Sequence, residues 1–214
     1  MFITFEGLDF SGKTTQANLL IARLRGLLRG QNDRVETLTL FREPGGTRIS
    51  ERIRDLLLDK KSLEMEDITE LFLFSASRHQ LVSEVIAPAL ERGEIIVCDR
   101  YADSTTAYQG YGRKMDLPLI RSINQAATMG VSPDITILVD IPVEEIVKRK
   151  KKAGVPFDRM ESFGKVFYER VRKGYYELAD AEPTRFCVVD GMAPIQEVQQ
   201  EIWTTVEPKL LIEK

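Results

Sequence analysis

Short apolar runs alternate with longer amphipathic stretches along the 214-residue chain. The short runs are rich in β-branched and aromatic residues, as strands are, whereas the longer stretches repeat apolar positions every three or four residues, as helices do. The strands that we predict are 2–6, 35–40, 94–98, 134–140 and 185–189. The helices that we predict are 13–29, 47–58, 67–92, 103–110, 116–129, 142–152, 164–181 and 194–206.

Two of the predicted strands, Ile95–Cys98 and Ile135–Val139, are apolar at almost every position. A strand that is apolar on both faces belongs in a parallel sheet that helices cover on both sides. The pattern therefore predicts one α/β domain over residues 1–214, with a doubly wound five-stranded parallel sheet. Ligands of such sheets bind at the carboxyl ends of the strands, so residues that directly follow a strand are the first site candidates.

The segment between the first strand and the first helix reads GLDFSGKT and fits the pattern G-x-x-x-x-G-K-[ST] at each fixed position. Backbone N–H groups of such a loop point into one concavity at a helix N-terminus, where the helix dipole also favours phosphate. Lys13 adds a positive charge, and the Thr14 hydroxyl is a ligand for Mg²⁺. We predict that a nucleoside triphosphate binds here, at Gly7, Leu8, Asp9, Phe10, Ser11, Gly12, Lys13 and Thr14.

Charged residues also follow the second predicted strand. Arg42 and Glu43 precede a turn formed by Pro44–Gly46, and Thr47 is placed to cap the next helix. These charges are predicted to lie at the binding edge of the sheet, and a charged turn before a capped helix is the less favoured alternative. Arg54 lies further along that helix and is either a phosphate ligand or a solvated residue.

The third predicted strand leads into Asp99 and Arg100. A carboxylate at this place holds Mg²⁺ or its water in phosphate-loop proteins, so we predict Asp99 as a metal ligand together with Thr14. A guanidinium binds phosphate through paired hydrogen bonds, which makes Arg100 a phosphate ligand. Residues 103–112 then read DSTTAYQGYG, and their hydroxyl and amide groups suit the edge of a pyrimidine or the exposed face of a capped helix.

Phe74 and Arg78 are four residues apart on a predicted helix and so share one face. An aromatic surface beside a guanidinium could hold the base and phosphate of one nucleotide, whereas a phenylalanine is more often part of the core. The neighbouring His79 is the only histidine, and we interpret it as a surface residue.

The composition narrows the classes of function. The 30 basic and 33 acidic side chains nearly cancel to a net charge of −3, so the chain lacks the overall positive charge of nucleic-acid binders. Cys98 and Cys187 lie in apolar runs, which indicates buried thiols. No apolar run approaches the roughly 20 residues of a membrane span, and the N-terminus reads as a core strand. We therefore expect a cytoplasmic protein with no membrane or nucleic-acid partner.

Two further segments are predicted to lie near the phosphate loop. The basic run Lys148–Lys152 leads into a Gly- and Pro-containing stretch, and the last strand ends at Asp190 and Gly191. A charge run is usually a solvated face, but a basic loop that closes over a triphosphate would exclude water and neutralise charge. We predict a small mobile lid at about 149–163, and a resting place for a purine ring beside the loop after the last strand.

Taken together, these motifs resemble those of thymidylate kinases, the P-loop kinases that phosphorylate dTMP to dTDP. The resemblance runs from residue 2 to about 190 and is carried by FEGLDFSGKTTQ, REPGG, LFLFSASR, DRYADSTTAYQGYG and PDITILVDIP. It implies a nucleoside monophosphate kinase-like fold, ATP with Mg²⁺ at the phosphate loop, dTMP in the cleft that faces it, and a cytosolic homodimer.

The resemblance also implies roles for individual residues. It places the base between Phe74, which stacks on thymine, and Arg78, Thr105 and Gln109, which read its edge. Tyr108 lies near them. Around the monophosphate it places three guanidinium groups, Arg42, Arg54 and Arg100. It brings Asp9 to the sugar or the metal region.

One residue departs from the family pattern. Where Phe10 stands, bacterial-type members usually have glycine and the eukaryotic type has a catalytic arginine. Because Phe10 carries no charge, the transition-state cation should come from the lid, as in the bacterial type, and the sequence does not distinguish Arg149, Lys151, Lys152 and Arg159. The bulk of Phe10 also leaves open a nucleotide-binding protein with altered catalysis.

Other readings of the phosphate loop remain. A P-loop kinase for another nucleotide would share all the phosphate chemistry, and only the predicted base site favours thymine. A GTPase switch needs an N-K-x-D motif, which the sequence lacks. A nucleic-acid-dependent ATPase would use the lysine run, and its binding would weaken steeply with salt.

Overall fold

The computed structural model describes residues 1–28, 38–154 and 164–212. Its five strands are β1 (Phe2–Glu6), β2 (Leu38–Arg42), β3 (Ile95–Asp99), β4 (Ile135–Asp140) and β5 (Phe186–Asp190). They form one sheet in the order β2-β3-β1-β4-β5, and every neighbouring pair is parallel. This confirms the predicted α/β fold with a five-stranded parallel sheet.

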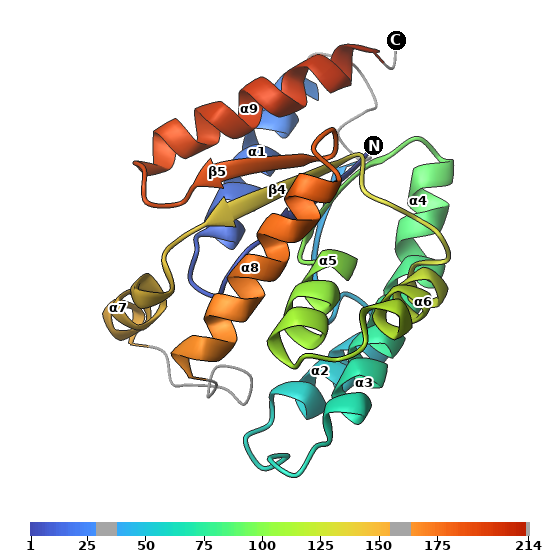
Figure 1. Cartoon of the computed structure of the whole chain (residues 1–214). Helices are drawn as coiled ribbons and strands as arrows, with labels where there is room; N and C mark the ends of the chain where they lie inside the picture. The colour runs from blue at the N-terminus through green and yellow to red at the C-terminus, as the bar shows by residue number, and fades with distance from the viewer. Residues whose placement is uncertain (29–37, 155–163, 213–214) are drawn as a thin grey trace.

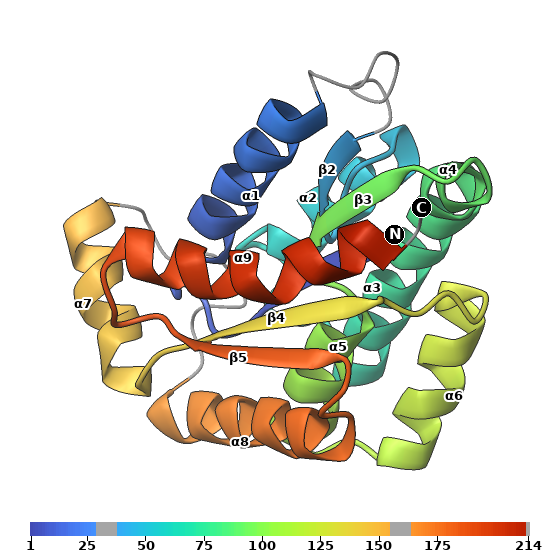
Figure 2. The same cartoon turned by 90° about the horizontal axis from the view of Figure 1, so that it is seen from above.

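Helices cover both faces of the sheet (Figure 1). Helices α1 and α9 lie on one face, and α8, α5, α3 and α4 lie on the other, whereas α7 lies beyond the carboxyl ends of β4 and β5, as the view from above also shows (Figure 2). The α-helices are α1 (Lys13–Leu28), α2 (Arg48–Leu58), α3 (Asp67–Leu81), α4 (Ala87–Glu91), α5 (Ala102–Thr105), α6 (Leu117–Thr128), α7 (Val143–Ala153), α8 (Lys165–Ala181) and α9 (Ile195–Ile212). Two π-helical segments, η2 (Val82–Ile86) and η3 (Thr106–Gly112), interrupt this series.

The central strand β1 is buried along its whole length because it serves two cores. Ile3 and Phe5 point to the side of α1 and α9, where Trp203 completes an apolar cluster, whereas Phe2 packs on the other side with Tyr101. Successive side chains of a strand point to opposite faces, so a strand with a core on each side must be apolar throughout. Both cysteines are free thiols; Cys98 is buried and Cys187 is half-buried.

Two predicted helices differ from the observed ones at prolines. The stretch 67–92 is helical from Asp67 to Glu91 as predicted, but its hydrogen bonds change to the π pattern at Val82–Ile86, one turn before Pro88, which has no N–H to donate. The last helix was expected to end at 206 but continues through Pro208. Beyond it, Leu210 packs against the core and Lys209 Nζ donates to the Asp134 carbonyl at 2.8 Å.

The second strand also ends later than predicted. Phe41 and Arg42 belong to β2 because they pair with Cys98 and Asp99 of β3. The pairing with β3, rather than the local pattern of β2, decides where this strand ends. Residues 35–37, the predicted start of this strand, lie outside the described part of the chain.

Candidate active site

The phosphate loop joins β1 to α1 at the carboxyl edge of the sheet, as predicted. Gly7 has a φ of 135°, and a Cβ there would lie 2.3 Å from the Val139 carbonyl oxygen, so only glycine lets the loop lie against β4. Lys13 is buried beneath the loop and its Nζ donates to the Leu8 carbonyl at 2.7 Å. Burial, and next the nearby guanidinium of Arg100, lower the pKa of Lys13 to about 8.

The two predicted metal ligands lie together. Thr14 is the second residue of α1 and Asp99 is the last residue of β3, the strand beside β1. The Thr14 hydroxyl donates to Asp99 Oδ2 at 2.5 Å. Both groups offer oxygen atoms, the donors that Mg²⁺ prefers, on the side of the loop where Lys13 also lies.

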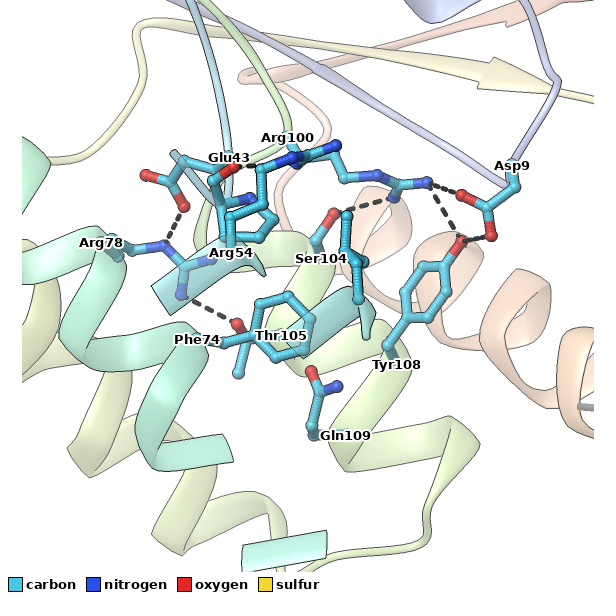
Figure 3. A pocket seen from close by; sticks show the side chains of 12 residues that line it. Asp9, Glu43, Arg54, Phe74, Arg78, Arg100, Ser104, Thr105, Tyr108 and Gln109 are labelled. Carbon is cyan, nitrogen blue, oxygen red and sulfur yellow. Dashed lines mark hydrogen bonds and ion pairs between the residues drawn. The ribbon is translucent and has the colours of Figure 1, made fainter. Parts of the chain in front are cut away.

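A cavity opens beside the loop and contains most of the predicted acceptor residues (Figure 3). Its walls come from the phosphate loop, α2, α3, α5 and η3, segments far apart in the sequence. Seven of the eight predicted substrate ligands line it, namely Arg54, Phe74, Arg78, Arg100, Thr105, Tyr108 and Gln109. Asp9, Glu43, Pro44, Leu58 and Ser104 complete the lining.

Arg42 is not among the residues that line the cavity. It stands at the end of β2 with its side chain half exposed, and its Nη2 lies 3.1 Å from Glu51 Oε2. Arg54, which is on α2 like Glu51, does line the cavity, and its Nη1 donates to the Pro44 carbonyl at 2.9 Å. The role of Arg42 in holding the monophosphate stays a prediction, and Glu51 is its partner in this structure.

Arg78 is held in the cavity wall by three partners. Its Nε donates to Glu43 Oε2 at 2.7 Å, its Nη1 to the Thr105 hydroxyl at 2.8 Å and its Nη2 to the Tyr101 carbonyl at 2.9 Å. The side chains of this ion pair are only 2% and 3% exposed. Burial raises the pKa of Glu43 to about 7 despite the charge of Arg78. The guanidinium is therefore fixed in direction before any ligand enters.

Arg100 connects the cavity to the phosphate loop. Its Nη2 lies 2.5 Å from Asp9 Oδ1, and its Nη1 donates to the Gly7 carbonyl at 3.1 Å. The Tyr108 hydroxyl lies 3.2 Å from both the Arg100 Nη2 and Asp9 Oδ2. Although burial alone would raise the pKa of Asp9, the charges of Arg100 and Lys13 hold it below its ordinary value.

A buried carboxylate behind Arg100 was not predicted from the sequence. Glu6, the last residue of β1, accepts from the Ser104 hydroxyl at 2.6 Å and from the Tyr175 hydroxyl at 2.8 Å. Both hydroxyl oxygens in turn accept from Arg100 Nη1, at 3.1 and 3.3 Å. Burial, and next the Asp103 carboxylate, raise the pKa of Glu6 to about 7. The signal for it in the sequence is a charged residue at the end of an apolar strand.

A second cavity lies on the other side of the phosphate loop. It is lined by Ser11, Gly12, Thr15, Gln16, Val139, Arg149, Lys152, Gly191, Ala193, Ile195 and Val198. The loop after β5 thus borders the phosphate loop, where the sequence predicts a purine ring. Arg149 closes one end, since its Nη1 donates to the Ser11 carbonyl at 3.2 Å and its Nη2 to the Gly191 carbonyl at 2.8 Å.

Phe10 turns its ring toward the helices that follow β4. It has a φ of 61° and packs against the apolar cluster of α7 and α8. Lys150, buried at the end of α7, lies with its Nζ 5.5 Å from the centre of the Phe10 ring. Of the candidate cations besides Arg149, Lys151 and Lys152 are exposed, and Arg159 lies outside the described residues, as do 155–163 of the predicted lid.

Comparisons with known proteins agree on one family. The family model described as "Thymidylate kinase" matches residues 5–202. The chain is 46% identical to the thymidylate kinase of Deinococcus radiodurans over 98% of this chain and 97% of that one, and 44% identical to that of Desulfovibrio desulfuricans over 98% and 96%. The crystal structure of thymidylate kinase from Ehrlichia chaffeensis superposes with a TM-score of 0.77 at 36% identity, covering 97% of this chain and 98% of that one. The chain belongs to the thymidylate kinase family.

Proposed function

We propose that this thymidylate kinase, which phosphorylates dTMP to dTDP, binds ATP along the phosphate loop and dTMP in the cavity that Arg78 and Arg100 line. The γ-phosphoryl group of ATP passes in line to the monophosphate. The acceptor oxygen is already an anion at neutral pH, so the reaction needs no strong general base, and catalysis is positioning and charge neutralisation.

The observation that carries this assignment is the place of Arg100. Its guanidinium contacts Asp9 and the Gly7 carbonyl of the phosphate loop and also lines the acceptor cavity. A cation in this position is shared by donor and acceptor phosphates. On the donor side Lys13 neutralises the phosphates. Arg149 donates to the Ser11 carbonyl of the loop, so it is the described lid residue best placed to add a second positive charge.

Magnesium fits the donor side of this site. Thr14 and Asp99 would hold it, since their oxygens already face each other at 2.5 Å. When bound with ATP, the ion neutralises the charge of the phosphates. Two protein ligands are enough, because Mg²⁺ keeps several waters and takes its other ligands from the phosphates.

The assignment of the base site is tested by measuring ADP release with ATP–Mg²⁺ and dTMP, dUMP, dCMP, dGMP or thymidine as acceptor. We expect a clear preference for dTMP. Preference for another acceptor would keep the phosphate chemistry but overturn the roles of Phe74, Arg78, Thr105 and Gln109. If none of them reacts, catalysis is altered, and Phe10→Gly tests whether the ring is the cause.

We further infer that the active form is a homodimer joined through α2 and α3. These helices pack side by side (Figure 1). Ile49 and Leu56, seven residues apart on α2, and Ile68 and Phe72, four apart on α3, are exposed, with Phe72 at 55%. Large exposed apolar side chains that share helix faces are typical of protein interfaces.

Sedimentation equilibrium checks the dimer. We expect twice the monomer mass for the wild type and a shift toward the monomer for Phe72→Glu, because the new charge would be buried in the interface. Val166→Glu, at an exposed apolar residue of α8, is the matched control and should leave the mass unchanged. A wild-type monomer at micromolar concentration would disprove the proposal.

The remaining partners are proposed from the sequence and the family. In the described residues no helix has the length and apolar character that a membrane span requires. We place the enzyme in the cytoplasm with ATP and dTMP as its partners and no nucleic acid. Measurable affinity for single- or double-stranded DNA at low salt would contradict that view.

A further inference from the structure

Glu70 is a buried carboxylate that lies behind the wall of the acceptor cavity. It stands on α3, one helical turn before Phe74, and its side chain has no exposed surface. Three donors surround it. Arg113 Nη2 contacts its Oε2 at 2.8 Å, Arg113 Nε contacts its Oε1 at 3.3 Å, and Gln109 Nε2 contacts the same Oε1 at 3.0 Å.

The charge of Glu70 fixes the direction of the Gln109 amide. Both oxygens of Glu70 accept from the Arg113 guanidinium, which has only donors, so this carboxylate acts as an acceptor on both sides. The amide group that faces it must therefore be the NH₂ of Gln109. In the opposite orientation the amide oxygen of Gln109 would face Glu70 Oε1 at the same 3.0 Å, with no hydrogen between the two acceptors.

The carbonyl oxygen of Gln109 is consequently turned the other way. Figure 3 shows it on the side of Phe74 and Thr105, inside the cavity that Gln109 lines. We propose that Glu70 is a specificity-determining positioning residue: by holding Nε2 of Gln109, it makes this part of the wall an acceptor for an N–H group of the base. The inference rests on the proposed base site.

This polarity distinguishes two bases of nearly the same shape. Thymine offers an acceptor at O4 and a donor at N3–H, whereas 5-methylcytosine offers a donor at N4 and an acceptor at N3. A wall with the donors of Arg78 and the acceptor of Gln109 matches thymine at both positions and opposes 5-methylcytosine at both. A site whose donors and acceptors match one base discriminates strongly against a base with the opposite donors and acceptors, because the polar groups of the site are then left unpaired.

The test compares dTMP with 5-methyl-dCMP, which differ only along this edge of the base. The kcat and KM for both are measured for the wild type, Glu70→Gln and Asp67→Asn. A glutamine at 70 both donates and accepts, so the Gln109 amide is free to turn. We expect the dTMP preference in kcat/KM to fall at least about tenfold in Glu70→Gln, mostly through KM, because one hydrogen-bond match is lost.

Asp67→Asn is the matched control. Asp67 lies one turn earlier on α3 and pairs with the same guanidinium, its Oδ1 2.8 Å from Arg113 Nη1, but no contact joins it to Gln109 in the described structure. Its replacement should leave the preference unchanged. An equal loss of preference in both variants would assign the effect to Arg113 and overturn the role of Glu70.

The outcomes separate the two proposals. A wild type that does not use dTMP would refute the base site itself, whereas a dTMP kinase whose preference survives Glu70→Gln would refute only the positioning role. If Glu70→Gln does not fold, Gln109→Met decides the polarity. We expect its dTMP preference to fall; a rise would mean that the NH₂ faced the base and would overturn the proposal.

Discussion

Replacing Arg100 with methionine is expected to lower kcat/KM for dTMP by about 10²–10³-fold, which corresponds to roughly 3–4 kcal/mol of lost transition-state stabilisation. The guanidinium is held in advance by Asp9, Gly7, Ser104 and Tyr175, so it neither searches for its position nor reorganises during the reaction. Methionine keeps about the length of the apolar stem of arginine but lacks the guanidinium, so it supplies no charge where donor and acceptor phosphates meet.

Two measurements make this prediction specific. The affinity for ATP–Mg²⁺, measured by calorimetry, should change much less than kcat/KM, because Lys13 and the loop N–H groups remain. Arg92→Met is the control, since Arg92 is an exposed arginine paired only with Glu94 in the described structure, and it should leave turnover unchanged. Near-native turnover in Arg100→Met would remove this residue from the mechanism.

Replacing Arg78 with methionine is expected to destabilise the fold by about 3–5 kcal/mol, besides weakening dTMP binding. Arg78 and Glu43 form a buried ion pair, and removing one member leaves the other charge buried without its partner. The Thr105 hydroxyl and the Tyr101 carbonyl lose a donor as well. The free energy of unfolding in urea measures the effect.

The pH dependence identifies Glu43 as the origin of this loss. The pKa of Glu43 is about 7 in the folded wild type, above its ordinary value of 4.5. Between pH 4.5 and 7 the folded state therefore binds more protons than the unfolded state, and the free energy of unfolding falls as pH rises through this range. Without Arg78 the pKa rises further. The wild type then stops losing stability above about pH 7, whereas the variant continues to lose it, and the difference between them should grow with pH.

The double variant Arg78→Met, Glu43→Gln supplies the control. With no carboxylate left at 43, its unfolding free energy should exceed that of Arg78→Met at pH 8 and should show a flatter pH dependence. If the single variant were as stable as the wild type at pH 8, or if its deficit shrank as pH rose, the buried charge would not be the cause.

The two predictions share a feature of the site's construction. The polar side chains that face the substrates are held by residues from other parts of the chain, so their directions are set by the folded structure. Arg100 relies on Glu6 of β1 through two hydroxyl groups, and Gln109 relies on Glu70 of α3. Activity therefore depends on buried residues that do not touch a ligand.

The sequence by itself determined the fold class and the phosphate loop, and it named most of the residues that line the candidate acceptor cavity. Continuous apolar strands identify a parallel sheet, and the spacing from Gly7 to Thr14 serves one kind of ligand. Residues that directly follow strands meet at one edge of such a sheet, so Asp99 and Arg100 were predicted to lie at that edge without coordinates. These are local signals, each readable within a few neighbouring residues.

Only the tertiary structure decided what depends on residues distant in the chain. The strand order, the end of β2 and the position of Arg42 beside Glu51 all follow from neighbours that no local pattern names. The buried carboxylates of Glu6 and Glu70 are the clearest cases. Their partners are up to 169 residues away in the chain, and a charge is stable in the core only where folding brings such partners to it.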